Sequence, residues 1–222
     1  MGNALTLVFG GTVICRHVVD AEDCLRDFLD GNKRQRHSGL VYYNHQPVTP
    51  CDQIFPEDLG ITLALNSRAT GRAVSSVSEK GQGLNLRALP SKPLEDTSES
   101  ERENLAQVLT DVSSWPGFKA SLATKMLHKK RPALIPVLDN LAIFGAYMNP
   151  DWPESRPSGE SIGDKPRIEQ ALNMIAADLV MPENLGTWRA LQEISPERKR
   201  IEIFDMVWWV HFERVESETL RA

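Results

Sequence analysis

Apolar residues recur every three or four positions over most of the chain beyond residue 50, which is the period of a helix with one buried face. Start signals accompany this period: Pro56 precedes two acidic residues, and residues 97–101 (Thr-Ser-Glu-Ser-Glu) match a capping box. A Pro- and Gly-rich stretch at 149–159 is interpreted as an inserted loop, because the helical period resumes after it. The predicted helices cover about 56–65, 97–109, 119–130, 139–147, 168–181, 188–194 and a long one that begins after 195–197 and ends near 214.

The first 50 residues have a different pattern. A β-branched and apolar run covers Leu5–Val13, an amphipathic segment covers Ala21–Leu29, and residues 39–43 form a strand candidate. The sequence therefore predicts a mainly α fold with a small N-terminal β/α elaboration at 1–50 and a helical domain at 51–222. We expect the two parts to form one compact unit.

The longest apolar stretch lies near the end of the chain, at Ile203–Phe212. Asp205 and His211 interrupt it, so it predicts a buried helix and no membrane span. Trp208 and Trp209 follow the helical spacing of this stretch and are predicted to be core residues and not base-stacking platforms.

Charged residues surround the start of this helix. Arg198, Lys199 and Arg200 are predicted to be surface charges, and Glu202 and Asp205 are predicted to lie at the rim of the apolar face. A buried carboxylate here would instead suggest a functional role.

Cysteine and histidine usage predicts neither a disulfide framework nor a metal site. Cys15, Cys24 and Cys51 are irregularly spaced, and pairing two of them leaves one over. The sequence has no Cys-x-x-Cys and no His-x-x-x-His pair, which are common metal-ligand spacings. We therefore expect no metal, no cofactor and a cytoplasmic location.

The chain is acidic, with a formal net charge of −5, yet its cations gather in one region. Residues 112–138 contain no Asp or Glu, and they include a tight Pro-Gly turn that precedes a predicted helix start. Five cations lie in this region: Lys119, Lys125, Lys129, Lys130 and Arg131. The arrangement favours contact with an anion, although a solvated helix C-terminus explains the last three cations equally well.

The segment Trp115–Leu127, which reads hydrophobic-Pro-Gly-hydrophobic-x-x-x-x-Ala-x-x-hydrophobic-Leu, resembles the helix-hairpin-helix of base-excision DNA glycosylases. In that superfamily the hairpin presents backbone N–H groups to a DNA phosphate. The resemblance continues into Leu134–Asn140, whose Pro-hydrophobic-Leu-Asp sequence is similar to the adenine-excising members of the endonuclease-III-type superfamily. Ser121 falls where lyase-active members carry a Schiff-base lysine and adenine-excising members carry serine. The resemblance covers residues 114–147.

This resemblance implies a role for each matched residue. Asp139 would be the catalytic carboxylate, which activates water or stabilises the oxocarbenium-like sugar of a damaged or mispaired base in duplex DNA. The serine at 121 implies a monofunctional glycosylase, although Lys125, four residues further on, is a candidate for a displaced amine. The residues expected to contact DNA are Gly117, Lys119, Ser121, Lys125 and Lys129.

The chain departs from the superfamily at two points. Lys119 replaces the usual second hairpin glycine, and no arginine follows Asp139 closely. Residues 123–139 also resemble an uncharacterised bacterial family with a Lys-Arg-Pro…Pro-x-x-Asp pattern, which implies no known activity. From the residues alone, Asp139 is well placed to be a helix N-cap, a role that is compatible with catalysis. A non-catalytic helical module that binds nucleic acid or protein is therefore the alternative function.

Overall fold

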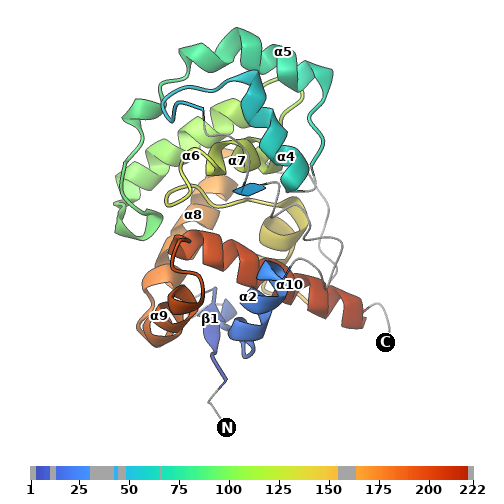
Figure 1. The fold of residues 1–222 in the computed structure, drawn as a ribbon, viewed down its shortest axis with the longest axis vertical. Coiled ribbons are helices and arrows are strands. Elements are labelled where there is room, and N and C mark those ends of the chain that lie inside the picture. Colours follow the sequence, from blue (N-terminus) through green and yellow to red (C-terminus); the bar gives the residue numbers. More distant parts are fainter. Residues whose placement is uncertain are drawn as a thin grey trace.

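The computed structural model describes residues 4–10, 14–30, 43–44, 49–65, 67–154 and 164–219. The fold is mainly helical, as predicted, with a small two-stranded antiparallel sheet near the N-terminus (Figure 1). In the view of Figure 1 one group of helices lies above and another lies below with the sheet, and both ends of the chain lie in the lower part.

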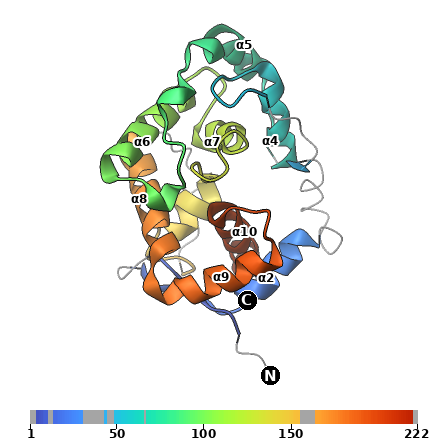
Figure 2. The same cartoon turned by 60° about the vertical axis from the view of Figure 1, so that its left-hand side comes forward.

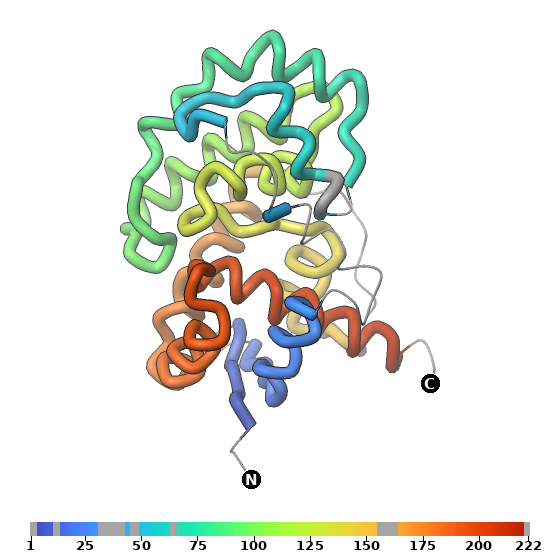
Figure 3. Tube along the Cα trace, viewed as in Figure 1, coloured from blue at the N-terminus to red at the C-terminus, as the bar shows by residue number. Residues whose placement is uncertain are grey.

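The N-terminal segment packs on the C-terminal helix. Strand β1 (Leu7–Phe9) pairs with β2 (Arg16–Val18), and the amphipathic segment forms helix α2 (Ala21–Leu29) with the predicted bounds. Helix α2 packs against the last helix, α10 (Arg200–Thr219), and the tube in Figure 3 shows these two segments side by side. The strand candidate at 39–43 lies outside the described residues except for its last position.

The upper part of the molecule begins with the predicted helix at Pro56, which starts as a 3-10 turn and continues as α4 (Ile61–Ala64). Helix α5 (Gly71–Lys80) was not expected from the sequence, because Ala73 and Val77 are its only buried apolar side chains and its other residues are mostly polar. The 3-10 elements here and in the connection that follows are η2 (Pro56–Gly60), η3 (Gly81–Gly83), η4 (Leu86–Ala88) and η5 (Leu94–Asp96).

Helix α6 (Glu99–Ser113) confirms the capping box. Glu101 N–H donates to Ser98 Oγ at 3.3 Å, and Ser98 N–H donates to Glu101 Oε2 at 2.7 Å, so two otherwise unpaired donors are satisfied. A short turn then leads into α7 (Ala120–His128), which packs against α6.

Helix α8 (Lys165–Val180) packs along α6 and runs from the upper group of helices to the lower group (Figure 2). After it come the 3-10 turn η7 (Pro182–Asn184) and α9 (Leu185–Ile194). Helix α10 begins later than the predicted cap at 195–197, because Glu202 Oε2 accepts the N–H of Lys199 at 2.9 Å and anchors the first turn there.

One contiguous core runs from Leu7 to Phe212 and joins both groups of helices. Phe9 lies in an edge-to-face cluster with Phe204 and Trp208, at ring-centroid distances of 5.3 and 5.7 Å. Trp208 is fully buried, as predicted, and Trp209 packs against the core while half-buried. In the part of the chain that the structure describes, no helix is both long and apolar enough to cross a membrane.

Two predictions about charge near α10 are wrong. Arg198, expected at the surface, is buried, and so is Glu202, expected at the rim. Their side chains form an ion pair at 3.1 Å, and Glu202 also accepts a backbone N–H, so the two charges are buried together.

Gly117 has a positive φ of +86°, and its Cα faces the start of α5. A Cβ at this position would lie 2.6 Å from the backbone nitrogen of Ala73 and 2.8 Å from Thr70 Oγ1. Ser76 Oγ donates to Pro116 O at 2.9 Å, which fixes the same approach. The Pro-Gly turn is therefore a packing contact between the α6–α7 connection and α5.

We expect Gly117→Ala to destabilise the protein by roughly 2 kcal/mol or more, because a side chain here is strained and meets backbone. Urea unfolding measures the change. Gly186→Ala is the matched control: Gly186 lies in α9 with nothing within 4 Å of its Cβ position, so alanine should add up to about 1 kcal/mol. Equal stability of the two variants would contradict the packing role of Gly117.

Candidate active site

Residues 134–139, named the return segment here, run back along one face of α7 in an extended path. Thr124 Oγ1 accepts the N–H of Leu138 at 3.0 Å and donates to Ala120 O at 2.9 Å. One turn further along, His128 Nδ1 lies 2.5 Å from Ile135 O, so this nitrogen carries the proton. These side chains satisfy Leu138 N–H and Ile135 O, while the N–H groups of Ile135 and Asp139 donate to backbone oxygens.

Helix α10 holds the return segment from another side. Asp205 Oδ2 accepts the N–H of Val137 at 3.1 Å. Just beyond the return segment, Trp208 Nε1 donates to Ala142 O at 2.7 Å. The segment is therefore fixed between α7 and α10, and so is the carboxylate at its end, Asp139.

Asp139 caps the helix that follows, η6 (Asn140–Tyr147), a π-helical turn. Its Oδ1 accepts the N–H groups of Leu141 at 2.9 Å and Ala142 at 3.2 Å. This confirms the interpretation of Asp139 as an N-cap. The two bonds occupy one carboxylate oxygen only and leave Oδ2 to face α7.

Oδ2 of Asp139 lies 3.5 Å from Lys125 Nζ and 3.4 Å from Ser121 Oγ. Ser121 and Lys125 are four residues apart on α7, so they share the face along which the return segment runs. Lys125 Nζ also donates to Ser67 Oγ at 2.9 Å. The structure thus places two predicted site residues, Ser121 and Lys125, beside one oxygen of a third, Asp139.

The environment of this group is mostly dry. The side chain of Lys125 is 7% exposed and that of Asp139 is 18% exposed, so the carboxylate is the more accessible member of the pair. Burial lowers the pKa of Lys125, while the attraction and hydrogen bond of Asp139 partly raise it again. The amine therefore loses its proton at a lower pH than an ordinary lysine, and the carboxylate can act on a group that approaches from solvent.

The other predicted DNA contacts lie apart from this cluster. Lys119 is exposed at the start of α7, where no side chain caps the helix, and Gly117 faces α5. Lys129 lies one turn beyond Lys125, and its Nζ donates to Tyr43 O at 2.8 Å while lying 4.1 Å from the Tyr43 ring centroid.

The end of α7 is not the solvated terminus that its charges suggested. Lys130 is buried and pairs with Asp58 at 2.8 Å. Arg131 donates to Leu86 O at 3.1 Å. Lys130 donates to Pro50 O and Arg131 donates to Leu86 O, so these cations connect the end of α7 to the segments at 49–60 and 84–89.

Sequence reasoning missed Ser67, Thr124 and His128 as neighbours of the site. Thr124 and His128 carry a sequence signal, because they are four residues apart on the face that also holds Ser121 and Lys125. Ser67 carries none, since a contact across 58 residues depends on the tertiary fold. Among the described residues no group of three His, Cys, Asp or Glu side chains is arranged to hold a metal ion.

The fold and the site define a mainly α-helical protein in which a capping aspartate is paired with a buried lysine. Residues 21–212 match a family model described as a family of unknown function (DUF6308), and the chain belongs to this family. Comparison with curated proteins and with solved structures gives no match.

We expect Asp139→Asn to lower the pKa of Lys125 further, because the substitution removes the negative charge that partly offsets the burial of the amine. Reductive carbon-13 methylation followed by NMR titration gives this pKa directly. Asp164→Asn is the control, because Asp164 is also a helix N-cap but accepts no cap hydrogen bond. A Lys125 pKa that is unchanged or higher in Asp139→Asn would contradict the ion pair.

Proposed function

We propose that this protein excises a damaged or mispaired base from duplex DNA by hydrolysing its N-glycosidic bond, with Asp139 as the catalytic carboxylate. The observation that supports this most is that the two carboxylate oxygens of Asp139 have different partners. Oδ1 is held by two backbone N–H groups, and Oδ2 faces Ser121 and Lys125, on a side chain that is 18% exposed. A carboxylate fixed through one oxygen keeps the other in a constant position for chemistry.

In the proposed reaction the bond between sugar C1′ and the base nitrogen breaks, and its electron pair leaves with the base. Positive charge develops on the sugar, and Asp139 Oδ2 stabilises it. Water then adds to C1′ and gives a proton to the carboxylate, the departing base takes up a proton from solvent, and the carboxyl group releases its proton to solvent to restore the enzyme. The products are the free base and an abasic sugar.

Lys125 supports this role through charge. Its ammonium group lies 3.5 Å from Oδ2 and supplies the counter-charge of the Asp139 carboxylate. Its amine is also hydrogen-bonded to Ser67 and takes no covalent part in the proposed reaction. The enzyme is therefore monofunctional and leaves the abasic strand uncut.

The proposed DNA contact is the start of α7. Lys119 is exposed there, and the first N–H groups of the helix have no side-chain cap. A phosphate at this position would meet both the cation and the positive end of the helix dipole. Gly117 serves the contact indirectly, since it lets the turn pack against α5.

One observation favours the alternative, a non-catalytic nucleic-acid-binding or protein-interaction module. The N-cap bonds of Asp139 give this residue a sufficient structural role without chemistry. Asp139→Asn separates the two functions, because asparagine caps a helix as well as aspartate does but carries no charge.

The test is incubation of the purified protein with duplexes that each carry one lesion or mismatch, followed by strand analysis with and without hot alkali. We expect one class of duplex to give breaks only after alkali treatment. Asp139→Asn should lower that rate at least about 100-fold while DNA affinity is kept, and it should cost some stability because Lys125 loses its counter-charge. Asp164→Asn, the same change at another N-cap, should keep full activity.

Full activity of Asp139→Asn would show that Asp139 is not the catalytic carboxylate. Breaks that appear without alkali would contradict the monofunctional mechanism and indicate imine formation by Lys125. A protein that binds DNA but releases no base from any duplex would contradict the enzyme and support the binding module.

A further inference from the structure

Two stretches of this acidic chain contain no Asp or Glu, and they pack against each other. One is 112–138, which holds the Pro-Gly turn and α7, and the other is 59–78, which holds α4 and most of α5. Helix α4 packs against α7, and the start of α5 packs against the turn. The fold therefore joins two regions without negative charge in a protein whose formal net charge is −5.

Residues 67–73, named the arginine segment here, connect the Asp139 site to the Pro-Gly turn. At one end of the segment, Ser67 Oγ accepts a hydrogen bond from Lys125 Nζ at 2.9 Å. At the other end, Ala73 lies against Gly117, where a Cβ built on the glycine would lie 3.1 Å from Ala73 Cα. Both ends of the arginine segment are therefore held by residues of the 112–138 stretch.

Arg68 and Arg72 lie between these two anchored ends, and both are exposed. Lys119, two residues beyond Gly117, is exposed as well. Within the described part of the chain, the side chains of these three residues form no ion pair and no hydrogen bond. They differ in this from the cations at the end of α7, which have oxygen partners in the protein. The three charges are therefore available to a ligand.

The three cations are close enough together to meet one strand of a duplex. Arg68 and Arg72 are four residues apart, so their Cα atoms are at most about 15 Å apart. The contact between Gly117 and Ala73 brings the Cα atoms of Arg72 and Lys119 within about 16 Å of each other. One strand of B-DNA carries a phosphate every ~3.4 Å along the helix axis, so each of these spans covers several phosphates.

The carboxylates that border the two stretches leave this positive charge in place. They are Asp58, Glu79, Asp111 and Asp139. The first and last pair with Lys130 and Lys125, at 2.8 and 3.5 Å. Asp111 accepts a hydrogen bond from Gln107 at 2.8 Å, so it points back along α6 and away from the turn. Glu79 lies seven residues along α5 from Arg72, which is about 10 Å and beyond the ~8 Å Debye length at physiological salt.

The residues around the two arginines suit a phosphate backbone. Thr70, Gly71 and Ser75 are exposed, and they are small or carry a hydroxyl group. Hydroxyl and backbone N–H groups are common donors to phosphate, and arginine binds phosphate through two parallel hydrogen bonds. The arginine segment has no aromatic side chain, the kind of anchor in which protein–protein interfaces are rich. The chemistry of the surface therefore favours nucleic acid over a protein partner.

We propose that Arg68 and Arg72, together with Lys119, bind the phosphate backbone of duplex DNA, which makes the arginine segment a second DNA contact beside the start of α7. The choice of duplex DNA as partner rests on the proposed function. Because Ser67 bonds to Lys125, which pairs with Asp139, a strand held by the arginine segment passes beside the reaction site. The two arginines position the strand and take no part in the reaction.

The test is fluorescence anisotropy of a labelled plain duplex with the full-length protein over a range of salt concentrations. We expect the double variant Arg68→Gln/Arg72→Gln to bind at least about tenfold more weakly at low salt. Its slope of log affinity against log salt should be shallower by about 1.8, because each lost phosphate contact removes about 0.9. The variant should match the wild type in urea unfolding, since neither arginine has a partner within the described residues.

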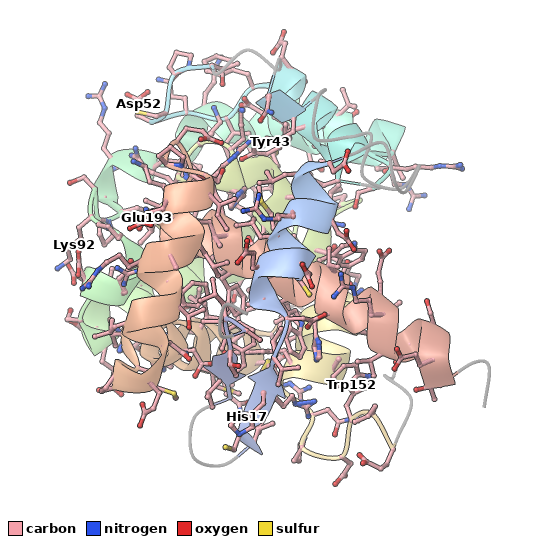
Figure 4. The ribbon with its side chains drawn as sticks, turned by 60° about the horizontal axis from the view of Figure 1, so that its bottom comes forward. His17, Tyr43, Asp52, Lys92, Trp152 and Glu193 are labelled. Atoms are coloured by element: carbon pink, nitrogen blue, oxygen red, sulfur yellow. The ribbon has the colours of Figure 1, made fainter. Side chains whose placement is uncertain are left out.

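Arg167→Gln/Arg189→Gln is the matched control, because it removes the same two charges from exposed side chains elsewhere. Arg189 lies on α9 in the lower group of helices, whereas α5 lies at the top of Figure 1. Figure 4 turns the lower part of the molecule forward and labels Glu193 of the same helix. The control should keep the affinity and the salt slope of the wild type.

Equal affinity and salt slope of Arg68→Gln/Arg72→Gln and wild type would overturn the proposal, and a wild type that still released a base would leave the enzyme standing. Equal weakening by the control would also overturn it, because net charge alone would then explain the binding. Absence of duplex binding by the wild type would overturn it whatever the excision assay shows. Binding that only Arg68→Gln/Arg72→Gln weakens, in a protein that releases no base, would support the surface and contradict the enzyme.

Discussion

The hydrogen bonds that hold the return segment between α7 and α10 are the constraint on which the rest of the site depends. An extended segment in the interior has no neighbouring strand to satisfy its backbone groups, and each unpaired one costs about 1–3 kcal/mol. Thr124, His128 and Asp205 supply the partners here. Because the three bonds fall on consecutive parts of the segment, they fix its register on α7, and with it the position of Asp139.

The same bonds explain why structure and candidate chemistry are difficult to separate in this protein. Asp139 starts a helix with one oxygen and pairs with a buried amine through the other. Removing the carboxylate would leave Lys125 buried without its counter-charge, which is costly. Asp to Asn keeps the shape and the cap hydrogen bonds of Asp139, so it isolates the effect of the charge, which includes the cost of leaving Lys125 unpaired.

Much of the fold could be predicted from local signals. The amphipathic period gave α2 its bounds, the capping box gave the start of α6, and the apolar stretch that contains Trp208 gave a buried α10. Helix α5 was missed because its burial depends on the Pro-Gly turn that packs on it and not on its own apolar residues. The burial of Arg198 was missed because the sequence does not show its ion pair with Glu202. That pair forms in the fold and offsets part of the free-energy cost of burying the charge.

The candidate site was predictable in part. Asp139 and Ser121 were predicted as site residues from a resemblance, and their proximity depends on the return segment, which the Pro-x-x-Asp pattern marks but does not place. The contact of Lys125 with Asp139 follows from helical spacing once the register is known. Ser67, which contacts Lys125, and Tyr43, which contacts Lys129, come from distant parts of the sequence, and no local pattern predicts these contacts.

The most direct test of the account is the binding of this protein to short duplexes that carry an abasic or cationic sugar, compared with plain duplex over a range of salt concentrations. A site built to stabilise a developing positive sugar should bind the modified duplex more tightly, and the affinity for both should fall as salt rises. Equal affinity for modified and plain duplex, or no binding at low salt, would contradict base excision and leave Asp139 as a helix cap.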